Sequence, residues 1–214
     1  MCKIDKLQLI TQDIPGKSHA LLAEEACKNG IRWIQLRVKN VSDEAWEKQA
    51  LATREVCKKY GAKLIINDNP HLAAKIQADG IHLGKNDMDP TEARKIAGNN
   101  CIIGATANTF EDIWELSGKN IDYIGLGPFR FTSTKDKLSP VLGAEGYKKI
   151  IEQCCLNNIA LPIIAIGGII PQDLPALLET GVYGVAVASS INTAENKSEL
   201  VQAYLNHLNQ GVKL

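Results

Sequence analysis

The sequence predicts a (β/α)8 barrel, a TIM barrel, that forms a single domain over residues 1–214. Eight short apolar runs, typical of buried strands, recur along the chain, and segments with apolar residues at spacings of three and four separate them. No low-complexity linker interrupts this series. An open, doubly wound sheet would show the same alternation, so the count of eight strands is what favours the barrel.

The predicted elements follow one another in regular order. The expected strands are 7–11, 33–37, 63–67, 80–84, 101–106, 123–127, 162–167 and 185–189. The clearest helical segments are 19–30, 44–61, 174–181 and 198–208. Gly30, Gly61 and Gly181 stand where helices should end, because glycine readily adopts the left-handed conformation of a C-terminal cap.

Composition narrows the classes of partner and compartment. Lysine plus arginine (24) equals aspartate plus glutamate (24), so no overall charge favours nucleic acid or an anionic membrane. The six cysteines form no C-x-x-C pair and are expected to be reduced thiols, as in a cytoplasmic protein. No apolar signal region or membrane-length stretch is present. We therefore expect small-molecule partners in the cytoplasm, and the sequence leaves a homo-oligomer open.

Polar residues stand at the C-terminal ends of most predicted strands, which is where barrels of this class form their active sites. In chain order they are Gln35, Arg37, Lys39, Asn67, Asp68, His82, Asp87, Thr106, Thr132, Ser133, Thr134, Lys135, Gly167, Gly168, Ser189 and Ser190. Polar strand ends are common singly, but seven at one end of a barrel predict a pocket. The stretch YIGLGPFRFTSTK (123–135) illustrates the pattern: a buried strand leads into hydroxyls closed by a lysine.

Three cations are expected to converge in this pocket. Side chains alternate along a strand, so Arg37 and Lys39 share one face, and Lys135 approaches from another strand. Arginine offers a planar fork to phosphate oxygens and lysine a point charge. In a chain with no net charge, this cluster indicates an anionic ligand with more charge than a single carboxylate, although each cation alone would fit a solvated surface charge.

Asp68 and Asp87 end neighbouring strands beside these cations. Mg²⁺ takes few protein carboxylates and completes its shell with water and phosphate oxygens, so the pair predicts a magnesium site. Asp87 belongs to NDMDP, which contains a second acid, and Asp89 before Pro90 is typical of a helix N-terminal cap. His82 faces the barrel interior by strand parity, with an orienting role or as an ordinary buried histidine.

A second anion site is expected after strands seven and eight. Gly167 and Gly168 permit close backbone approach to a ligand, and the amides near Ser189 and Ser190 open a helix. These two loops form the usual phosphate site of such barrels. A pair of tight turns would explain the glycines equally well.

At this point the motifs become recognisable. IQLRVK, LIINDNPHLA, ADGIHLGKND, DYIGLGPFRFTSTK, PIIAIGGI and YGVAVAS resemble, in order and spacing, those of the thiamine-phosphate synthase (thiamine-phosphate pyrophosphorylase) family, over nearly the whole chain. That resemblance implies a Mg²⁺-dependent transferase. It would join 4-amino-2-methyl-5-hydroxymethylpyrimidine diphosphate to hydroxyethyl-methylthiazole phosphate, giving thiamine phosphate and pyrophosphate.

The resemblance also implies a role for each matching residue. Contacts to the pyrimidine diphosphate would come from Gln35, Arg37, Lys39, Asn67 and Lys135, Mg²⁺ would be held by Asp68 and Asp87, and the thiazole phosphate would be bound by Thr132, Thr134, Gly168, Ala188 and Ser189. Arg37, Lys39 and Lys135 would act in catalysis by stabilising the leaving pyrophosphate, together with the Thr106 hydroxyl.

The sequence departs from the family pattern at several positions. Asn69 replaces a usual cation, Thr106 a serine and Asn108 a histidine, while Phe131 stands where proline is common. Asn69 is expected to weaken diphosphate binding unless Lys85, in place of a common glutamine, supplies charge nearby. We also predict that the loop after strand six, residues 130–140, closes over the substrates as a hinged lid.

Three other functions fit parts of the sequence. A thiazole tautomerase shares the motifs, but its proposed catalytic histidine falls at Asn108. A non-catalytic ligand-binding barrel of the thiamine pathway would tolerate INDN. A sugar-phosphate epimerase could use Asp68 and Asp87 as acid and base, with no use for the three cations.

Overall fold

Eight parallel strands close into a barrel in the order β1 to β8, as the sequence predicts. The computed structural model describes residues 4–131 and 140–210, and the strands and helices given below are those within these ranges. The strands are β1 (Leu7–Ile10), β2 (Trp33–Leu36), β3 (Lys63–Asn67), β4 (Gly80–Leu83), β5 (Ile102–Ala107), β6 (Tyr123–Leu126), β7 (Ile163–Ile166) and β8 (Gly184–Val187). Closure between β1 and β8, with Leu9 paired to Val187, excludes the open doubly wound sheet.

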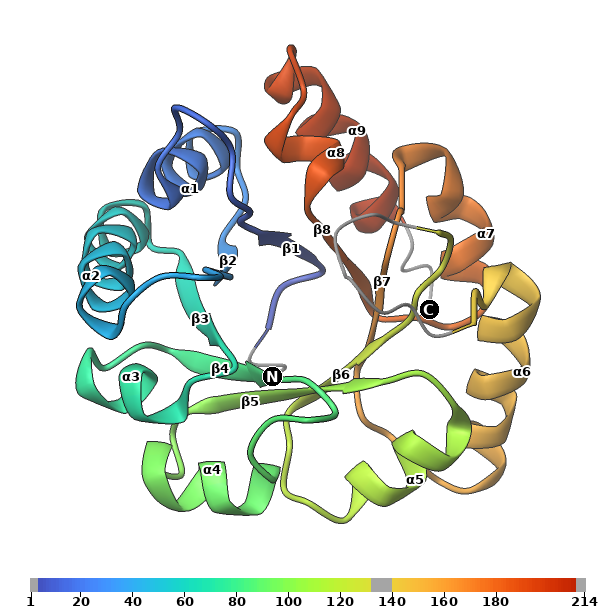
Figure 1. Ribbon diagram of the computed structural model, residues 1–214. Coiled ribbons are helices and arrows are strands. Elements are labelled where there is room, and N and C mark those ends of the chain that lie inside the picture. Colours follow the sequence, from blue (N-terminus) through green and yellow to red (C-terminus); the bar gives the residue numbers. More distant parts are fainter. Residues whose placement is uncertain (1–3, 132–139, 211–214) are drawn as a thin grey trace.

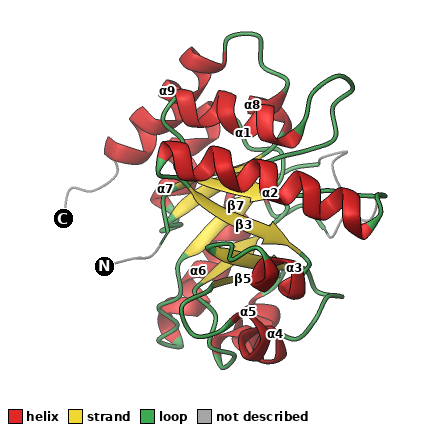
Figure 2. Cartoon of the chain, turned by 90° about the vertical axis from the view of Figure 1, so that its left-hand side faces the viewer, coloured by secondary structure: helices red, strands yellow, loops and turns green. Residues whose placement is uncertain are grey.

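Helices surround the ring of strands, as seen in Figure 1 and from the side in Figure 2. They are α1 (His19–Lys28), α2 (Asp43–Tyr60), α3 (Pro70–Lys75), α4 (Pro90–Ala97), α5 (Phe110–Ser117), α6 (Gly143–Leu156), the 3-10 turn η1 (Pro171–Asp173), α7 (Leu174–Glu179), α8 (Ser189–Asn192) and α9 (Lys197–Gln210). Gly61 caps α2 in the left-handed conformation, with φ +62°. Gly30 and Gly181, also at positive φ, each follow a helix by one further residue.

Strand alternation divides the core into two layers. Ile34, Leu36 and Val38 point outward into the large core between the strands and the helices. Trp33 and Tyr123 point inward, together with Ile65, Ile102, Ile164 and Ala186, and fill the barrel interior. The barrel is therefore a packed core, and any ligand must bind at its ends.

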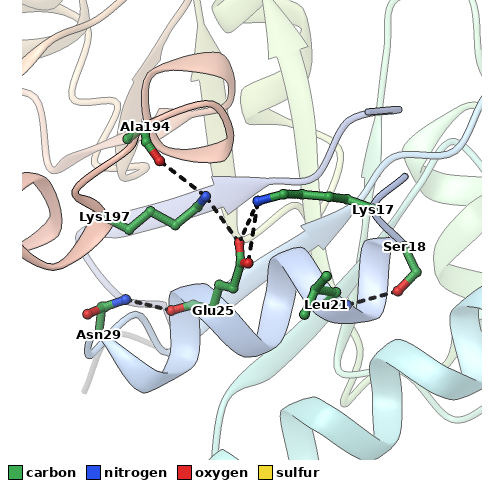
Figure 3. A network of polar contacts seen from close by, with 7 residues as sticks. All are labelled: Lys17, Ser18, Leu21, Glu25, Asn29, Ala194 and Lys197. Carbon is green, nitrogen blue, oxygen red and sulfur yellow. Dashed lines mark hydrogen bonds and ion pairs between the residues drawn. The ribbon is translucent and has the colours of Figure 1, made fainter. Parts of the chain in front are cut away.

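A charged cluster joins the loops that follow the first and last strands (Figure 3). Glu25 of α1 accepts Lys17 Nζ at 3.4 Å and Lys197 Nζ at 3.1 Å, and Lys197 also donates to the Ala194 carbonyl. Ser18 caps α1 through the Leu21 amide. This cluster connects α1, and the loop before it, to the start of α9.

Two predictions about the environment of the chain can be compared with the fold. The cysteines within the described residues are free thiols, and Cys27, Cys57, Cys101 and Cys154 are buried. None of the helices in residues 4–131 and 140–210 has the length and apolar character needed to cross a membrane.

Candidate active site at the mouth of the barrel

The two aspartates predicted to hold a metal meet at the mouth. Asp68 directly follows β3 and Asp87 lies in the loop after β4. Their carboxyl groups are close enough to share a hydrogen bond when one of them is protonated, and Lys39 Nζ lies 2.9 Å from Asp68 Oδ2. Two carboxyl groups and one of the predicted cations are therefore adjacent at the mouth of the barrel.

Local backbone structure holds both carboxyl groups in position. Asp68 adopts the left-handed conformation, with φ +65°, and its amide donates to the His82 carbonyl at 2.8 Å. Such a conformation is unfavourable for a residue with a side chain and recurs at functional sites. Asp87 Oδ2 accepts the Gly84 amide at 2.6 Å. A Cβ at Gly84 would lie 2.9 Å from that oxygen, so glycine leaves room for the carboxylate.

The two carboxyl groups differ in acidity. Burial, and next the hydrogen bond with Asp68, raise the pKa of Asp87 to about 6. Burial also opposes ionisation of Asp68, but hydrogen bonds from Asp87 and Lys39 outweigh it, so its pKa is lowered. The pair resists carrying two negative charges, which a divalent cation would offset. No cluster of three or more metal-binding side chains occurs in the described parts of the chain. Two carboxylates alone suit Mg²⁺, which keeps most of its ligands as water or phosphate oxygens.

The predicted alternation along β2 holds beyond the end of that strand. Val38 is buried in the outer core, while Arg37 is half-buried and Lys39 exposed at the mouth. The Arg37 amide donates to Thr11 Oγ1 at 3.2 Å, which fixes the backbone there. Lys135, Thr132 and Thr134 lie outside the described residues, as does most of the segment predicted to act as a lid.

Three uncharged site residues form the floor of the mouth. Gln35, Asn67 and Thr106 are buried, with exposed fractions of 2%, 7% and 6%. Gln35 donates to Gln8 Oε1 at 3.0 Å, and Thr106 Oγ1 lies 3.0 Å from His82 Nε2.

Sequence reasoning overlooked two partners of this floor, Gln8 and Tyr123. Both are inward-facing polar groups in otherwise apolar strands. That contrast is visible in LQLI and YIGL, and it could have identified both residues.

Gly168 and the start of α8 lie on the far side of the mouth, after β7 and β8 respectively. Ala188 is half-buried and Ser189 exposed, at the N-terminal end of α8. Gly168 has φ +70°, and a Cβ there would lie 2.3 Å from Arg130 Cγ. Arg130 donates to the Gly168 carbonyl at 2.9 Å and pairs with Asp173 at 2.7 Å. The two glycines after β7 thus make room for the chain that leaves β6.

The residues that depart from the family pattern have structural partners. Asn69 caps α3 by accepting the Leu72 amide at 2.9 Å. Lys85 pairs with Asp112 at 2.7 Å, so its charge is directed to α5. Asn108 donates from its side chain to the Gly127 carbonyl. Asp89 accepts the Thr91 amide at 2.8 Å, which confirms it as the cap of α4.

Known proteins resemble this chain over almost its whole length. A family model described as thiamine monophosphate synthase matches residues 7–191. The thiamine-phosphate synthase of Flavobacterium psychrophilum is 47% identical over 197 residues, 92% of this chain and 96% of that protein. The thiamine-phosphate synthase of Phocaeicola vulgatus is 48% identical over 194 residues, 91% of this chain and 93% of that protein.

A solved structure agrees in fold as well as in sequence. The thiamine phosphate pyrophosphorylase from Pyrococcus furiosus superimposes with a TM-score of 0.84 and 31% identity, covering 97% of this chain and 96% of that one. The match in sequence, motif order and closed barrel leads to one assignment: the chain belongs to the thiamine monophosphate synthase family.

Proposed function

We propose that this protein is a thiamine-phosphate synthase, a transferase that joins 4-amino-2-methyl-5-hydroxymethylpyrimidine diphosphate to hydroxyethyl-methylthiazole phosphate. The products are thiamine phosphate and pyrophosphate. The observation that carries the proposal is the meeting of Asp68, Asp87 and Lys39 at the mouth of a barrel whose sequence matches this family. A carboxylate pair beside a lysine suits a metal-bound diphosphate better than a neutral ligand.

The diphosphate would bind on the side formed by β2, β3 and β4. Asp68 and Asp87 would hold Mg²⁺, which when bound supplies positive charge to the diphosphate oxygens. Arg37 and Lys39 would contact the same oxygens, joined by Lys135, while Gln35 and Asn67 would orient the pyrimidine from the floor. The thiazole phosphate would lie opposite, on Gly168, Ala188, Ser189, Thr132 and Thr134.

The chemistry requires charge stabilisation more than proton transfer. Breaking the bond between the pyrimidine methylene and the diphosphate oxygen leaves the electron pair on pyrophosphate. Arg37 and Lys39 are placed to stabilise that charge, as Lys135 would be. The electron-rich aminopyrimidine carries the positive charge until the thiazole nitrogen forms the new carbon–nitrogen bond. That nitrogen has no proton to lose, so the step needs no general base.

The rival functions predict different arrangements. A tautomerase-like isomerase would need an acid–base group near position 108, where the Asn108 side chain is instead bonded to the Gly127 carbonyl. An epimerase would use Asp68 and Asp87 as acid and base, and its reaction would not require the positive charge of Lys39 beside them. A non-catalytic barrel would bind the substrates without turnover. We further propose that the protein works in the cytoplasm, whose reducing conditions suit its buried free thiols.

The direct test is incubation of purified protein with both substrates, with Mg²⁺ or with EDTA, and detection of thiamine phosphate and pyrophosphate. We expect both products in equal amounts and only with Mg²⁺. Product formation no faster than without protein would refute the proposal. Binding of the thiazole phosphate without turnover would support the non-catalytic barrel instead.

A further inference from the structure

A chain of buried polar side chains crosses the barrel interior and connects two residues of the candidate site. It runs from Gln35 through Gln8, Tyr123 and His82 to Thr106. The successive distances are 3.0 Å, 3.5 Å, 3.0 Å and 3.0 Å, between Gln35 Nε2 and Gln8 Oε1, Gln8 Nε2 and Tyr123 OH, Tyr123 OH and His82 Nδ1, and His82 Nε2 and Thr106 Oγ1. All five side chains are at least nine-tenths buried. A polar chain in such surroundings needs every member paired.

Two glycines, Gly104 and Gly125, leave the space that these hydrogen-bonded side chains fill. Gly104 of β5 lies between His82 of β4 and Tyr123 of β6 in the strand register. A Cβ at Gly104 would lie 2.0 Å from Tyr123 Cζ, so only glycine lets the tyrosine reach over β5 to the histidine. Gly125 likewise makes space for the imidazole, because its Cβ would lie 2.9 Å from His82 Cε1.

The hydrogen bonds have a direction, which follows from the amide of Gln8. Its carbonyl oxygen accepts from Gln35, so its NH2 group faces Tyr123 and donates to the phenol oxygen. Burial raises the pKa of Tyr123, so the phenol keeps its proton and can donate it to His82 Nδ1. A neutral imidazole that accepts at Nδ1 carries its proton on Nε2.

The last link is the one that bears on the site. A proton on His82 Nε2 is donated to Thr106 Oγ1, so the threonine acts there as an acceptor. Its own hydroxyl proton is then available to an acceptor other than His82, such as a ligand at the mouth. With the opposite tautomer, Thr106 would donate to His82 and could only accept a hydrogen bond from a ligand.

We propose that Tyr123 is a positioning residue: through His82 it makes Thr106 a hydrogen-bond donor toward an acceptor atom of the pyrimidine diphosphate. The identity of this ligand rests on the proposed function, whereas the direction of the hydrogen bonds does not. The alternative is that these side chains only satisfy one another's hydrogen bonds inside the core. In that case the tautomer of His82 would have no effect on turnover. The two cases therefore differ in a spectroscopic and in a kinetic measurement.

The spectroscopic test uses protein labelled with ¹⁵N-histidine, at a pH where histidine is neutral. Signals of His82 are assigned by replacing His19, His71 and His207 in turn with glutamine. We expect a proton on Nε2 of His82 in the wild type, and a new population protonated on Nδ1 in Tyr123→Phe. A wild-type proton on Nδ1, or the same tautomer in Tyr123→Phe, would overturn the proposal.

Tyr147→Phe is the matched control, because Tyr147 is also fully buried but its hydroxyl bonds to the Leu126 carbonyl and the Ile166 amide, outside the chain. We expect it to lose stability without changing the His82 tautomer. A tautomer change in this control equal to that in Tyr123→Phe would show a general effect of core hydroxyls and overturn the proposal. A wild-type proton on Nδ1 of His82 would overturn the proposal even where Tyr123→Phe does not fold.

The kinetic test is a double-mutant cycle with both substrates and Mg²⁺. Tyr123→Phe should lower kcat about 10-fold, the effect of one ordinary hydrogen bond, with KM for the thiazole phosphate unchanged. In a Thr106→Val background the same change should have little further effect, because the hydroxyl it positions is gone. Independent, multiplying effects would overturn the proposal. An inactive wild type would instead contradict the proposed function, and the tautomer measurement would still test the chain.

Discussion

The carboxyl groups of Asp68 and Asp87 lie within hydrogen-bonding reach of each other, although the two residues are 19 positions apart and follow different strands. Lys39 pairs with Asp68 at 2.9 Å, while Asp87 is held by the Gly84 amide. Burial and the neighbouring Asp68 raise the pKa of Asp87 to about 6, so a second negative charge at this point is unfavourable without a metal ion. The Asp87 carboxyl group that is expected to bind the metal ion should therefore destabilise the metal-free protein.

Asp87→Asn should stabilise the protein when no divalent cation is present. A carboxyl group whose folded pKa is raised to about 6 weakens the fold at every pH where the unfolded carboxyl group is ionised, above about pH 4. The Asp87 carboxyl group is partly shielded by its neighbours, but the residue as a whole is exposed, so solvent screening limits the gain to about 1 kcal/mol, or about 2–4 °C in Tm.

Thermal unfolding in EDTA measures this difference at about pH 7.5 and again below about pH 4, where it should vanish because both proteins are then neutral at this position. An Asp87→Asn protein less stable than wild type at neutral pH would show that the hydrogen bond from Gly84 outweighs the charge repulsion.

Asp68→Ala and Asp87→Ala should each abolish Mg²⁺-dependent synthesis while the protein remains folded. Each removes one of the two carboxylates expected to hold the ion. Asp89→Ala is the matched control: Asp89 is a nearby exposed acid, but it caps α4 and pairs with Lys119 at 2.8 Å. It should lose stability of about 1 kcal/mol with its Mg²⁺ response intact. Normal Mg²⁺ dependence in Asp87→Ala would place the metal elsewhere.

Lys39→Ala should chiefly lower kcat, by about 10²-fold, the effect of removing one preorganised charge-stabilising group. Its ammonium group lies beside the carboxylate pair, where the leaving diphosphate is expected. Lys75→Ala is a suitable comparison, since Lys75 also forms an exposed ion pair, with Glu47 at 2.6 Å, but on α3 away from the mouth. Steady-state kinetics with each substrate varied distinguishes a loss of kcat from a rise in KM. A change confined to KM would mean that Lys39 serves binding alone.

Glu25→Gln should weaken the ion pairs that connect α1 to Lys197 of α9 and to Lys17. Burial opposes ionisation of Glu25, but Lys197 and then Lys17 outweigh it and lower its pKa. A lowered folded pKa contributes stability above the unfolded value of about 4.3 and loses it as pH falls further. The variant should lose at most about 1 kcal/mol at neutral pH and nothing in acid. Chemical denaturation at both pH values tests this, with the exposed Glu55→Gln as control.

Gly104→Ala should destabilise the protein by about 1–3 kcal/mol, the usual range for overpacking a core. The added methyl group would lie 2.0 Å from Tyr123 Cζ and must displace that ring. Gly118→Ala is the control, because a Cβ there meets nothing within 4 Å. Urea denaturation compares the two. Equal stabilities would mean that Tyr123 shifts without strain.

Local sequence patterns determined most of the architecture. Each predicted strand overlaps an observed one, because short apolar runs bounded by turn residues are a local property of the chain. Alternation of side chains also placed Arg37 and Lys39 on the opposite face from Val38, as observed. The position of Asp89 before Pro90 was enough to identify a cap, since capping depends on the next few residues alone.

Other features depended on the tertiary structure, because they join residues that are distant in sequence. The sequence placed Asp68 and Asp87 near each other, but only the fold decided that Asp87 is partly shielded from water and close enough to Asp68 for its pKa to be raised. Lys85 was a candidate for the diphosphate site, yet its ammonium group forms an ion pair with Asp112 of α5 at 2.7 Å.

The buried chain that includes Gln8 and Tyr123 is the clearest case. No local pattern predicts that a tyrosine will reach across a neighbouring strand, because that depends on which glycine lies between the two strands once the barrel has closed. Sequence periodicity determines which residues point inward, and only the register of the closed barrel decides which of them touch.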